Sequence, residues 1–403
     1  MTYVNIDVRH FKRMFEAMGI NPGGQLSVEE IIGREREIDR YWAVLERQSL
    51  VLNAERRIGK TSILQKMGAL GREGFHTYYQ ELERVHSVTE LISQIYRTVS
   101  VDLPRAKRLK ASAIKGWLAL SSDRLEKLAV PSAGDAWKTL LEVAVKDVLD
   151  AFEDDTKVVF MWDEFPLMLY NLRQREGADK TIQLLDTLRY LRAAYPRLRF
   201  LFTGSIGLHL ALKSLRADGN ANAPFNDVQI ELAPPMSLSD TAALIGNLCE
   251  ALRHVPQEPA EIARRIGVLL GGFAYHIHHC LDQLDQLGRP AKGTDVDTAV
   301  EAVATHPSDP ANIGYTQYRI ETYYSTEDAR IALFILDVLA GSDEPLGLQG
   351  LLNQVRHKDA GADEHHVKSV CEMLRQDQCI TKANDRFAFT WPIVKRWWRD
   401  RRL

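Results

Sequence analysis

A short apolar segment followed closely by a glycine-lysine-threonine triplet constrains this chain more than any other feature. Residues 50–52 are Leu-Val-Leu, which predicts a buried strand, and a helical pattern opens after Gly59-Lys60-Thr61. Most of the phosphate-binding pattern G-x-x-x-x-G-K-[ST] is therefore present, with Ala54 at the position of the first glycine. In such a loop the backbone N–H groups and the helix N-terminus converge on phosphate groups. Lys60 is then expected on the β- and γ-phosphates and the Thr61 hydroxyl on Mg²⁺.

A second apolar segment, residues 158–162, ends in two carboxylates, Asp163 and Glu164. A fully buried strand with a carboxylate at its C-terminal end is typical of the Walker B element, in which Asp163 would hold Mg²⁺. Glu164 is then placed to polarise an attacking water. A plain strand followed by an acidic turn is the alternative, and the upstream Gly59-Lys60-Thr61 makes it the weaker interpretation.

A third apolar segment, residues 198–203, predicts another strand, which ends in Thr203-Gly204-Ser205. Either Thr203 or Ser205 is suited to sense the γ-phosphate. Shorter strands are expected at residues 76–80 and 228–232. The sequence therefore predicts an α/β fold, a parallel sheet of about five strands with an ATPase site at the carboxyl ends of the strands. The expected cofactors are ATP and Mg²⁺.

Composition restricts the class of protein only broadly. The chain has 403 residues, enough for two or three domains, with 45% hydrophobic and 26% charged residues. Its net charge of -3 gives no general attraction to nucleic acid or anionic membrane. Four scattered cysteines show no C-x-x-C spacing, no apolar run approaches 18 residues, and the N-terminus does not resemble a signal peptide. A cytoplasmic protein without a membrane partner is expected.

Three further segments have sequence patterns that predict local structure or function. Ser27 to Glu30 resembles a capping box, and a helix is expected from Ile31 to about Leu45. An insertion at residues 103–134 begins with a basic run, residues 105–110, which is interpreted as a solvated linker in preference to a phosphate-contacting arm. A helix at residues 181–194 carries Arg189 and Arg192, either of which is a candidate arginine finger or an ordinary surface arginine.

From Leu238 onward the pattern is helical. A helix at residues 273–287 contains His276, His278 and His279, whose spacing favours packing over metal binding. From residue 329, three helices and two short strands across Asn384-Asp385 predict a winged helix-turn-helix. The expected helices and strands are residues 331–339, 348–355, 363–376, 379–382 and 386–389, and the chain closes on a tryptophan-rich basic tail, residues 391–402.

Together these residues resemble the archaeal-type ATPases, a STAND-class branch of the AAA-related P-loop NTPases. The resemblance extends from about residue 31 to the C-terminus and rests on Ile32-Gly33-Arg34-Glu35, Arg56 to Ser62, Trp162 to Pro166, Thr203-Gly204-Ser205 and Gly271 to Tyr275. It implies that Ile32, Gly33 and Arg34 lie near adenine. It also implies that ATP or ADP is bound by Arg57, Gly59, Lys60, Thr61, Ser62, Thr203 and Ser205. Members tolerate alanine at the position of Ala54, whereas Ala274 replaces a usual proline.

The resemblance also implies a domain order and a function. We expect an N-terminal extension (1–30), an ATPase core (31–235), a helical lid (236–326) and a winged helix (327–403). Members are thought to act as nucleotide-dependent switches in signalling or defence, here with slow ATP hydrolysis and with a protein partner or self-association. The alternative is an ATP-dependent DNA-binding protein. The mixed charge of helix 363–376 is unfavourable for DNA binding. The basic tail and the basic run at residues 105–110 favour DNA binding.

Overall fold

The computed structural model describes residues 19–24, 26–103, 136–217, 223–359 and 361–403, and the chain forms two compact units. The sheet unit consists of Glu35–Arg56 and Lys60–Pro234. The helical unit consists of the segment ending at Arg34, the short stretch Arg57–Gly59 and Pro235–Leu403. The basic run at residues 105–110 lies outside the described residues.

The sheet unit contains five parallel strands in the order β2-β3-β4-β1-β5, which confirms the predicted α/β fold. The strands are β1 (Leu50–Asn53), β2 (Phe75–Glu81), β3 (Lys157–Asp163), β4 (Leu198–Thr203) and β5 (Gln229–Leu232). Every residue of β4, and every residue of β3 after Lys157, is buried. Strands with helices on both faces have this continuous apolar character.

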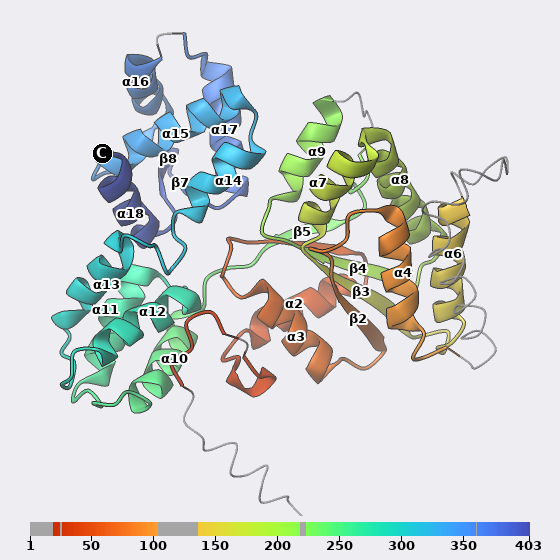
Figure 1. Ribbon diagram of the computed structural model, residues 1–403, viewed down its shortest axis with the longest axis horizontal. Coiled ribbons are helices and arrows are strands. Elements are labelled where there is room, and N and C mark those ends of the chain that lie inside the picture. Colours follow the sequence, from red (N-terminus) through yellow and green to blue (C-terminus); the bar gives the residue numbers. More distant parts are fainter. Residues whose placement is uncertain (1–18, 25, 104–135, 218–222, 360) are drawn as a thin grey trace, which may run out of the picture. The chain divides into compact units, whose positions relative to one another are not determined.

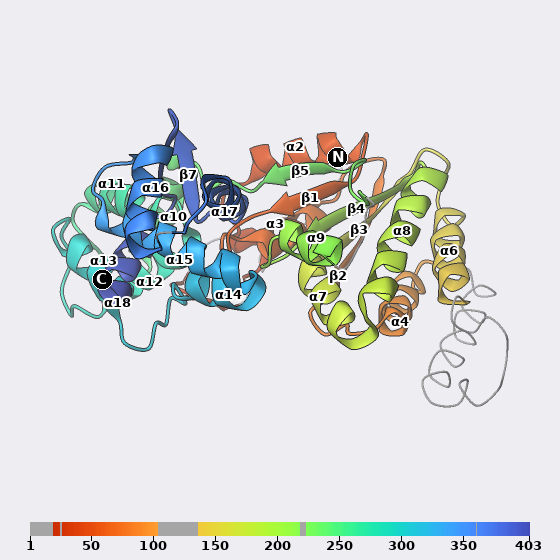
Figure 2. The same cartoon turned by 90° about the horizontal axis from the view of Figure 1, so that it is seen from above.

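Helices cover both faces of this sheet. The crossover from β1 to β2 runs in the opposite direction to the three later crossovers, so the right-handed rule places its helix on the other face. The helix of this crossover is α3. Figures 1 and 2 show α2, which precedes β1, on one side of the sheet and α7, α8 and α9 on the other. The helices are α2 (Glu35–Leu45), α3 (Lys60–Leu70), α4 (Val88–Val99), α6 (Ala136–Leu149), α7 (Phe165–Glu176), α8 (Ala178–Ala194) and α9 (Leu208–Ala217).

Aromatic side chains fill the core beside β3 and β4. Phe200 and Phe202 stack with ring centroids 5.3 Å apart, and Trp162 lies 4.9 Å from Phe200. The Trp162 Nε1 group donates a 2.6 Å hydrogen bond to Gln80 of β2, so the one polar atom of this ring is satisfied. This packing fixes the end of β3, where Asp163 follows Trp162.

The segment before β1 differs from the expectation of one capped helix over residues 31–45. The capping box forms, and the Ser27 N–H donates to the Glu30 carboxylate at 2.7 Å, but it closes only a short 3-10 helix, η1 (Val28–Glu30). The chain then passes through Gly33 and Arg34, whose φ angles are +70° and +74°. Left-handed backbone cannot continue a helix, so α2 begins at Glu35.

The first part of the helical unit is a group of five helices. They are α10 (Leu238–Glu250), α11 (Pro259–Leu270), α12 (Ala274–Asp285), α13 (Asp295–Thr305) and α14 (Tyr315–Tyr323). α10 packs on α11 and α12 packs on α13, with Ile262, Ile266 and Leu281 fully buried between them. Among the described residues, no helix has the length and apolar character that crossing a bilayer requires.

The last part of the helical unit has the element order of a winged helix-turn-helix. The helices are α15 (Thr326–Gly341), α16 (Leu348–Lys358), α17 (Glu364–Gln376) and the terminal α18 (Pro392–Arg402). The strands β6 (Leu346–Gly347), β7 (Ile380–Ala383) and β8 (Arg386–Phe389) form an antiparallel sheet in the order β6-β8-β7. Asn384 and Asp385 both have positive φ, +49° and +57°, which suits the two-residue turn expected there. The division of this unit at residue 326 stays a prediction.

Candidate nucleotide-binding site

The phosphate-binding loop connects β1 to α3, and Lys60 is the first residue of that helix. Gly59 has φ +104°, a conformation that side-chain-bearing residues rarely adopt, so glycine is needed where the loop enters the helix. Lys60 is 6% exposed, and its ammonium donates to the Ala54 and Glu55 carbonyls at 3.1 and 2.9 Å. The lysine is thus held inside the loop at the N-terminus of α3, with Ser62 half-buried in the first turn.

The structure brings the predicted magnesium ligands together. The Thr61 hydroxyl donates to Asp163 Oδ2 at 2.6 Å, across 102 residues of sequence. Asp163 is 2% exposed, and its other oxygen accepts hydrogen bonds from the Thr203 hydroxyl and from the Glu164 N–H. Three strand ends therefore converge on one carboxylate, since Thr61 follows β1, Asp163 ends β3 and Thr203 ends β4.

Glu164 stands in an unusual backbone conformation beside this carboxylate. Its φ and ψ are +57° and +29°, in the left-handed region, and it is the N-cap of α7. Its side chain reaches Ser205, just after β4, which donates to Glu164 Oε2 through its N–H at 2.9 Å and its hydroxyl at 2.8 Å. Either Thr203 or Ser205 was predicted to sense the γ-phosphate. In the structure the Thr203 hydroxyl donates to Asp163 and the Ser205 hydroxyl donates to Glu164.

Burial raises the pKa of Glu164 above its ordinary value. The two Ser205 hydrogen bonds and the Lys60 charge lower the pKa, whereas the neighbouring Asp163 raises it. The balance leaves a more basic carboxylate than a surface glutamate, which is the direction that favours proton acceptance near neutral pH.

On β2, the pKa of the Tyr79 hydroxyl is raised by burial and by nearby carboxylates, Asp163 foremost among them. The sequence motifs did not predict Tyr79 as a site residue. The only sequence feature that could have indicated it is its position two residues before the end of β2.

Two arginine contacts join residues 57–59 to the rest of the helical unit. Arg34 is 4% exposed and donates to the Ile58 carbonyl at 3.0 Å. The guanidinium carbon of Arg57 lies 4.9 Å from the ring centroid of Tyr275 on α12. Gly33 leaves no room for a side chain, since an added Cβ would lie 2.6 Å from the Asp240 carboxyl carbon. The roles of Ile32, Gly33 and Arg34 near adenine, and of Arg57 in nucleotide binding, stay predictions.

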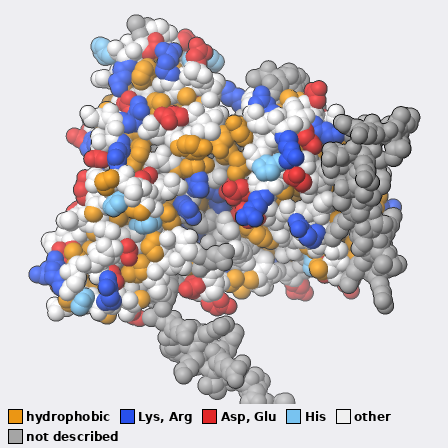
Figure 3. Space-filling model, viewed as in Figure 1, with side chains coloured by type: hydrophobic (Ala, Val, Ile, Leu, Met, Phe, Trp, Pro, Cys, Tyr) orange, Lys and Arg blue, Asp and Glu red, His pale blue; other side chains and the backbone are white. Residues whose placement is uncertain are grey.

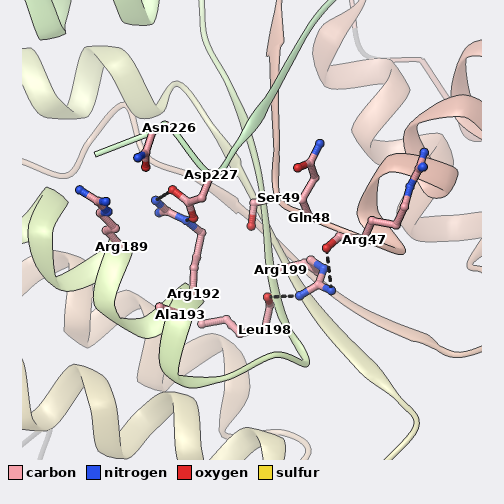
Figure 4. Close-up of a pocket in the computed structure, with 10 residues that line it drawn as sticks. All are labelled: Arg47, Gln48, Ser49, Arg189, Arg192, Ala193, Leu198, Arg199, Asn226 and Asp227. Carbon is pink, nitrogen blue, oxygen red and sulfur yellow. Dashed lines mark hydrogen bonds and ion pairs between the residues drawn. The ribbon is translucent and has the colours of Figure 1, made fainter. Parts of the chain in front are cut away.

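Arg192, a candidate arginine finger, is committed to a contact inside the sheet unit. Its Nε and Nη2 atoms donate to the two Asp227 carboxylate oxygens at 2.7 and 2.9 Å. Figure 4 shows this pair in a cavity of about 410 Å³ that Ser49 and Leu198 also line, where β1 and β4 begin. The phosphate-binding loop follows the opposite end of β1. Arg192 is buried and makes two hydrogen bonds to Asp227, so it is unsuited to act as an arginine finger. Arg189 is half-buried and remains a candidate.

The three histidines of α12 lie in packing environments. His276 stacks on Phe273 with centroids 4.2 Å apart, and His278 Nδ1 accepts a hydrogen bond from the Asn21 N–H at 3.1 Å. Tyr275 meets His279 edge-on at 4.7 Å. Within the described part of the chain, no group of three or more His, Cys, Asp and Glu side chains is placed to hold a metal ion.

Solved structures share this architecture. The chain is similar to the Walker-type ATPase PABY2304 of Pyrococcus abyssi, with a TM-score of 0.61 and 16% identity over 94% of this chain and 99% of that one. The fold is that of a P-loop ATPase. The Aeropyrum pernix ORC2 protein, solved as ADPNP-ADP complexes, is also similar, with a TM-score of 0.51 and 15% identity over 96% of this chain and 97% of that one. No protein-family model and no curated protein matches the sequence.

Proposed function

We propose that the protein binds ATP with Mg²⁺, hydrolyses it slowly to ADP and phosphate, and acts as a nucleotide-dependent, STAND-like switch in signalling or defence. The observation that carries the proposal is the 2.6 Å contact between Thr61 and Asp163, beside Lys60 and Glu164. A P-loop and a Walker B carboxylate that meet in this way are suited to a nucleotide-bound metal ion.

The chemistry of the side chains fits Mg²⁺. Thr61 and Asp163 supply one hydroxyl and one carboxylate, and both are hard oxygen ligands. Mg²⁺ is usually bound by one or two carboxylates together with substrate phosphates, so a dedicated cage of protein ligands is not required. When bound, the ion would neutralise charge that develops on the phosphate oxygens.

The residues divide the reaction between them. Lys60 would contact the β- and γ-phosphates, and the loop N–H groups would hold the phosphate chain. Glu164 would accept a proton from water as the water oxygen bonds to the γ-phosphorus and the bond to the ADP oxygen breaks. Burial and the Ser205 hydrogen bonds fix where that carboxylate points. The products are ADP and phosphate, and their release would end the contacts that hold the ATP state.

The alternative, DNA binding through the winged helix and tail, has less support because the tail cations are already paired. Arg396 contacts Glu301 at 3.1 Å, Arg399 contacts Asp343 at 2.6 Å, and Arg402 contacts Asp337 at 2.7 Å. On the face shown in Figure 3, basic and acidic side chains are interspersed. Phosphate contacts need accessible cations, so we favour the switch.

A thermal-shift titration tests the proposal. ATP with Mg²⁺ at about a hundredfold over its Kd should stabilise the protein by about 2.7 kcal/mol. Lys60→Ala should remove most of this ATP-dependent shift, because it deletes the cation at the phosphates. Lys146→Ala, an exposed lysine of α6, is the matched control and should leave the shift intact. An undiminished shift in Lys60→Ala would place the site elsewhere.

A further inference from the structure

Residues 57–59 of the phosphate-binding loop belong to the helical unit. The chain leaves the sheet unit after Arg56, contributes Arg57–Gly59 to the helical unit, and returns to the sheet unit at Lys60. Backbone N–H groups of this short stretch are those that a bound phosphate would meet. Whatever holds residues 57–59 therefore also sets the shape of the phosphate cradle.

Two contacts within the helical unit hold this stretch. The Arg34 guanidinium donates to the Ile58 carbonyl at 3.0 Å, and both residues are almost fully buried. The Arg57 guanidinium lies over the face of the Tyr275 ring at 4.9 Å, a cation–π geometry. The first contact fixes the backbone of the loop, and the second fixes the direction of its exposed arginine.

Tyr275 is itself firmly placed in α12. Its hydroxyl donates to the Pro310 carbonyl at 3.2 Å, and its ring packs edge-on against His279 at 4.7 Å. It is the second residue of α12, after Ala274, and Phe273 connects this helix to the Gly271-Gly272 turn that ends α11. The ring that receives Arg57 therefore moves only if α12 moves.

We propose that Tyr275, acting through Arg57, positions the phosphate-binding loop, so that nucleotide affinity depends on a helix far from the loop in sequence. Arg57, which the resemblance placed among the nucleotide-binding residues, is then a positioning residue. The inference rests on the proposed nucleotide site. By linkage, the factor by which the Arg57–Tyr275 contact changes nucleotide affinity equals the factor by which bound nucleotide changes the strength of that contact.

A double-mutant cycle isolates the contact. Tyr275→Leu removes the aromatic face, and Arg57→Gln removes the cation. Each should weaken binding of a fluorescent ADP analogue by about twofold to fivefold, the size of an exposed cation–π contact. The double variant should bind no more weakly than either single variant, because both remove the same interaction. Tyr275→Phe is the matched control, since it keeps the ring and loses only the hydroxyl bond to Pro310, and it should bind like wild type.

The outcomes separate this inference from the proposed function. If wild type does not bind the analogue, or binds it as Lys60→Ala does, the nucleotide site itself is wrong. If wild type binds and the effects of Tyr275→Leu and Arg57→Gln add fully, the two residues act independently and the inference is overturned. Circular dichroism melting of each variant without nucleotide shows whether a loss of affinity comes from unfolding.

Discussion

Ser205 donates two hydrogen bonds to Glu164, at 2.9 Å from its N–H and at 2.8 Å from its hydroxyl. Ser205, which follows β4, therefore helps to orient the Glu164 carboxylate, and its hydrogen bonds oppose the rise in the Glu164 pKa that burial causes. The sequence predicted separate roles for the two residues, Glu164 in polarising water and Ser205 as a possible γ-phosphate sensor. Their pairing makes Ser205 a positioning residue for Glu164.

Ser205→Ala should shift the pH dependence of ATP hydrolysis. The hydroxyl bond lowers the Glu164 pKa, so its loss should raise that pKa further. A general base works only when deprotonated, so the acid limb of the rate profile should move to higher pH while the alkaline plateau changes little. Steady-state rates from pH 5 to 9 provide the measurement. Ser214→Ala in α9 is the control, and an unshifted limb in Ser205→Ala would contradict the role.

Glu164→Gln should separate hydrolysis from binding. The amide keeps the size of the side chain but cannot accept the proton, so turnover should fall by about 10² or more. ATP affinity should change little, because Lys60 and Thr61 are untouched, and the variant should accumulate with ATP bound. Asp163→Asn should instead weaken Mg²⁺ and nucleotide together, since it alters the carboxylate that receives Thr61. Wild-type turnover in Glu164→Gln would assign the water to another residue.

The paired tail predicts weak and tail-independent DNA binding. Replacing Arg396 and Arg399 with glutamine should leave the salt dependence of any DNA affinity unchanged, because Glu301 and Asp343 already neutralise them. Fluorescence anisotropy with duplex DNA at several salt concentrations, with ATP present, measures this slope. If the slope of log affinity against log salt concentration falls by about one for each arginine replaced, these arginines contact phosphate and the DNA-binding alternative is supported. Lys368→Gln tests the exposed face of α17 in the same assay.

The buried histidines of α12 predict a loss of stability in acid. Burial lowers the pKa of His276 to about 3, with a smaller contribution from His279. In the unfolded chain the imidazole pKa is about 6.5, so below that pH the unfolded state binds more protons and the free energy of unfolding falls as pH decreases toward 3. Between pH 7.5 and 5 this histidine should cost about 2 kcal/mol.

His276→Leu is the variant that tests this linkage. It should lose about 2 kcal/mol less than wild type between pH 7.5 and 5, whatever its stability at neutral pH. Urea unfolding at the two pH values gives the comparison. Equal losses in both proteins would mean that His276 does not remain neutral in the folded state.

The sequence predicted the sheet and its carboxyl-end site because these depend on local patterns. Apolar runs mark β1, β3 and β4; Asp163 ends β3, Thr203 ends β4, and Lys60 begins the helix that follows β1. The break before α2 was missed because it depends on the left-handed backbone of Gly33 and Arg34, which the capping pattern does not encode. The sequence could not predict which side chains pair with one another. Arg192 with Asp227 and Glu164 with Ser205 are hydrogen-bonded pairs of residues far apart in the chain.

The backbone at Glu164 places function and stability in opposition. A side chain in the left-handed region costs about 1 kcal/mol or more, and glycine would adopt this φ without that penalty. Glycine at this position would relieve the backbone but would also leave the Ser205 N–H and hydroxyl without their carboxylate acceptor. The left-handed residue at the end of β3 is therefore kept at a cost, and the group kept there is the one proposed to activate water.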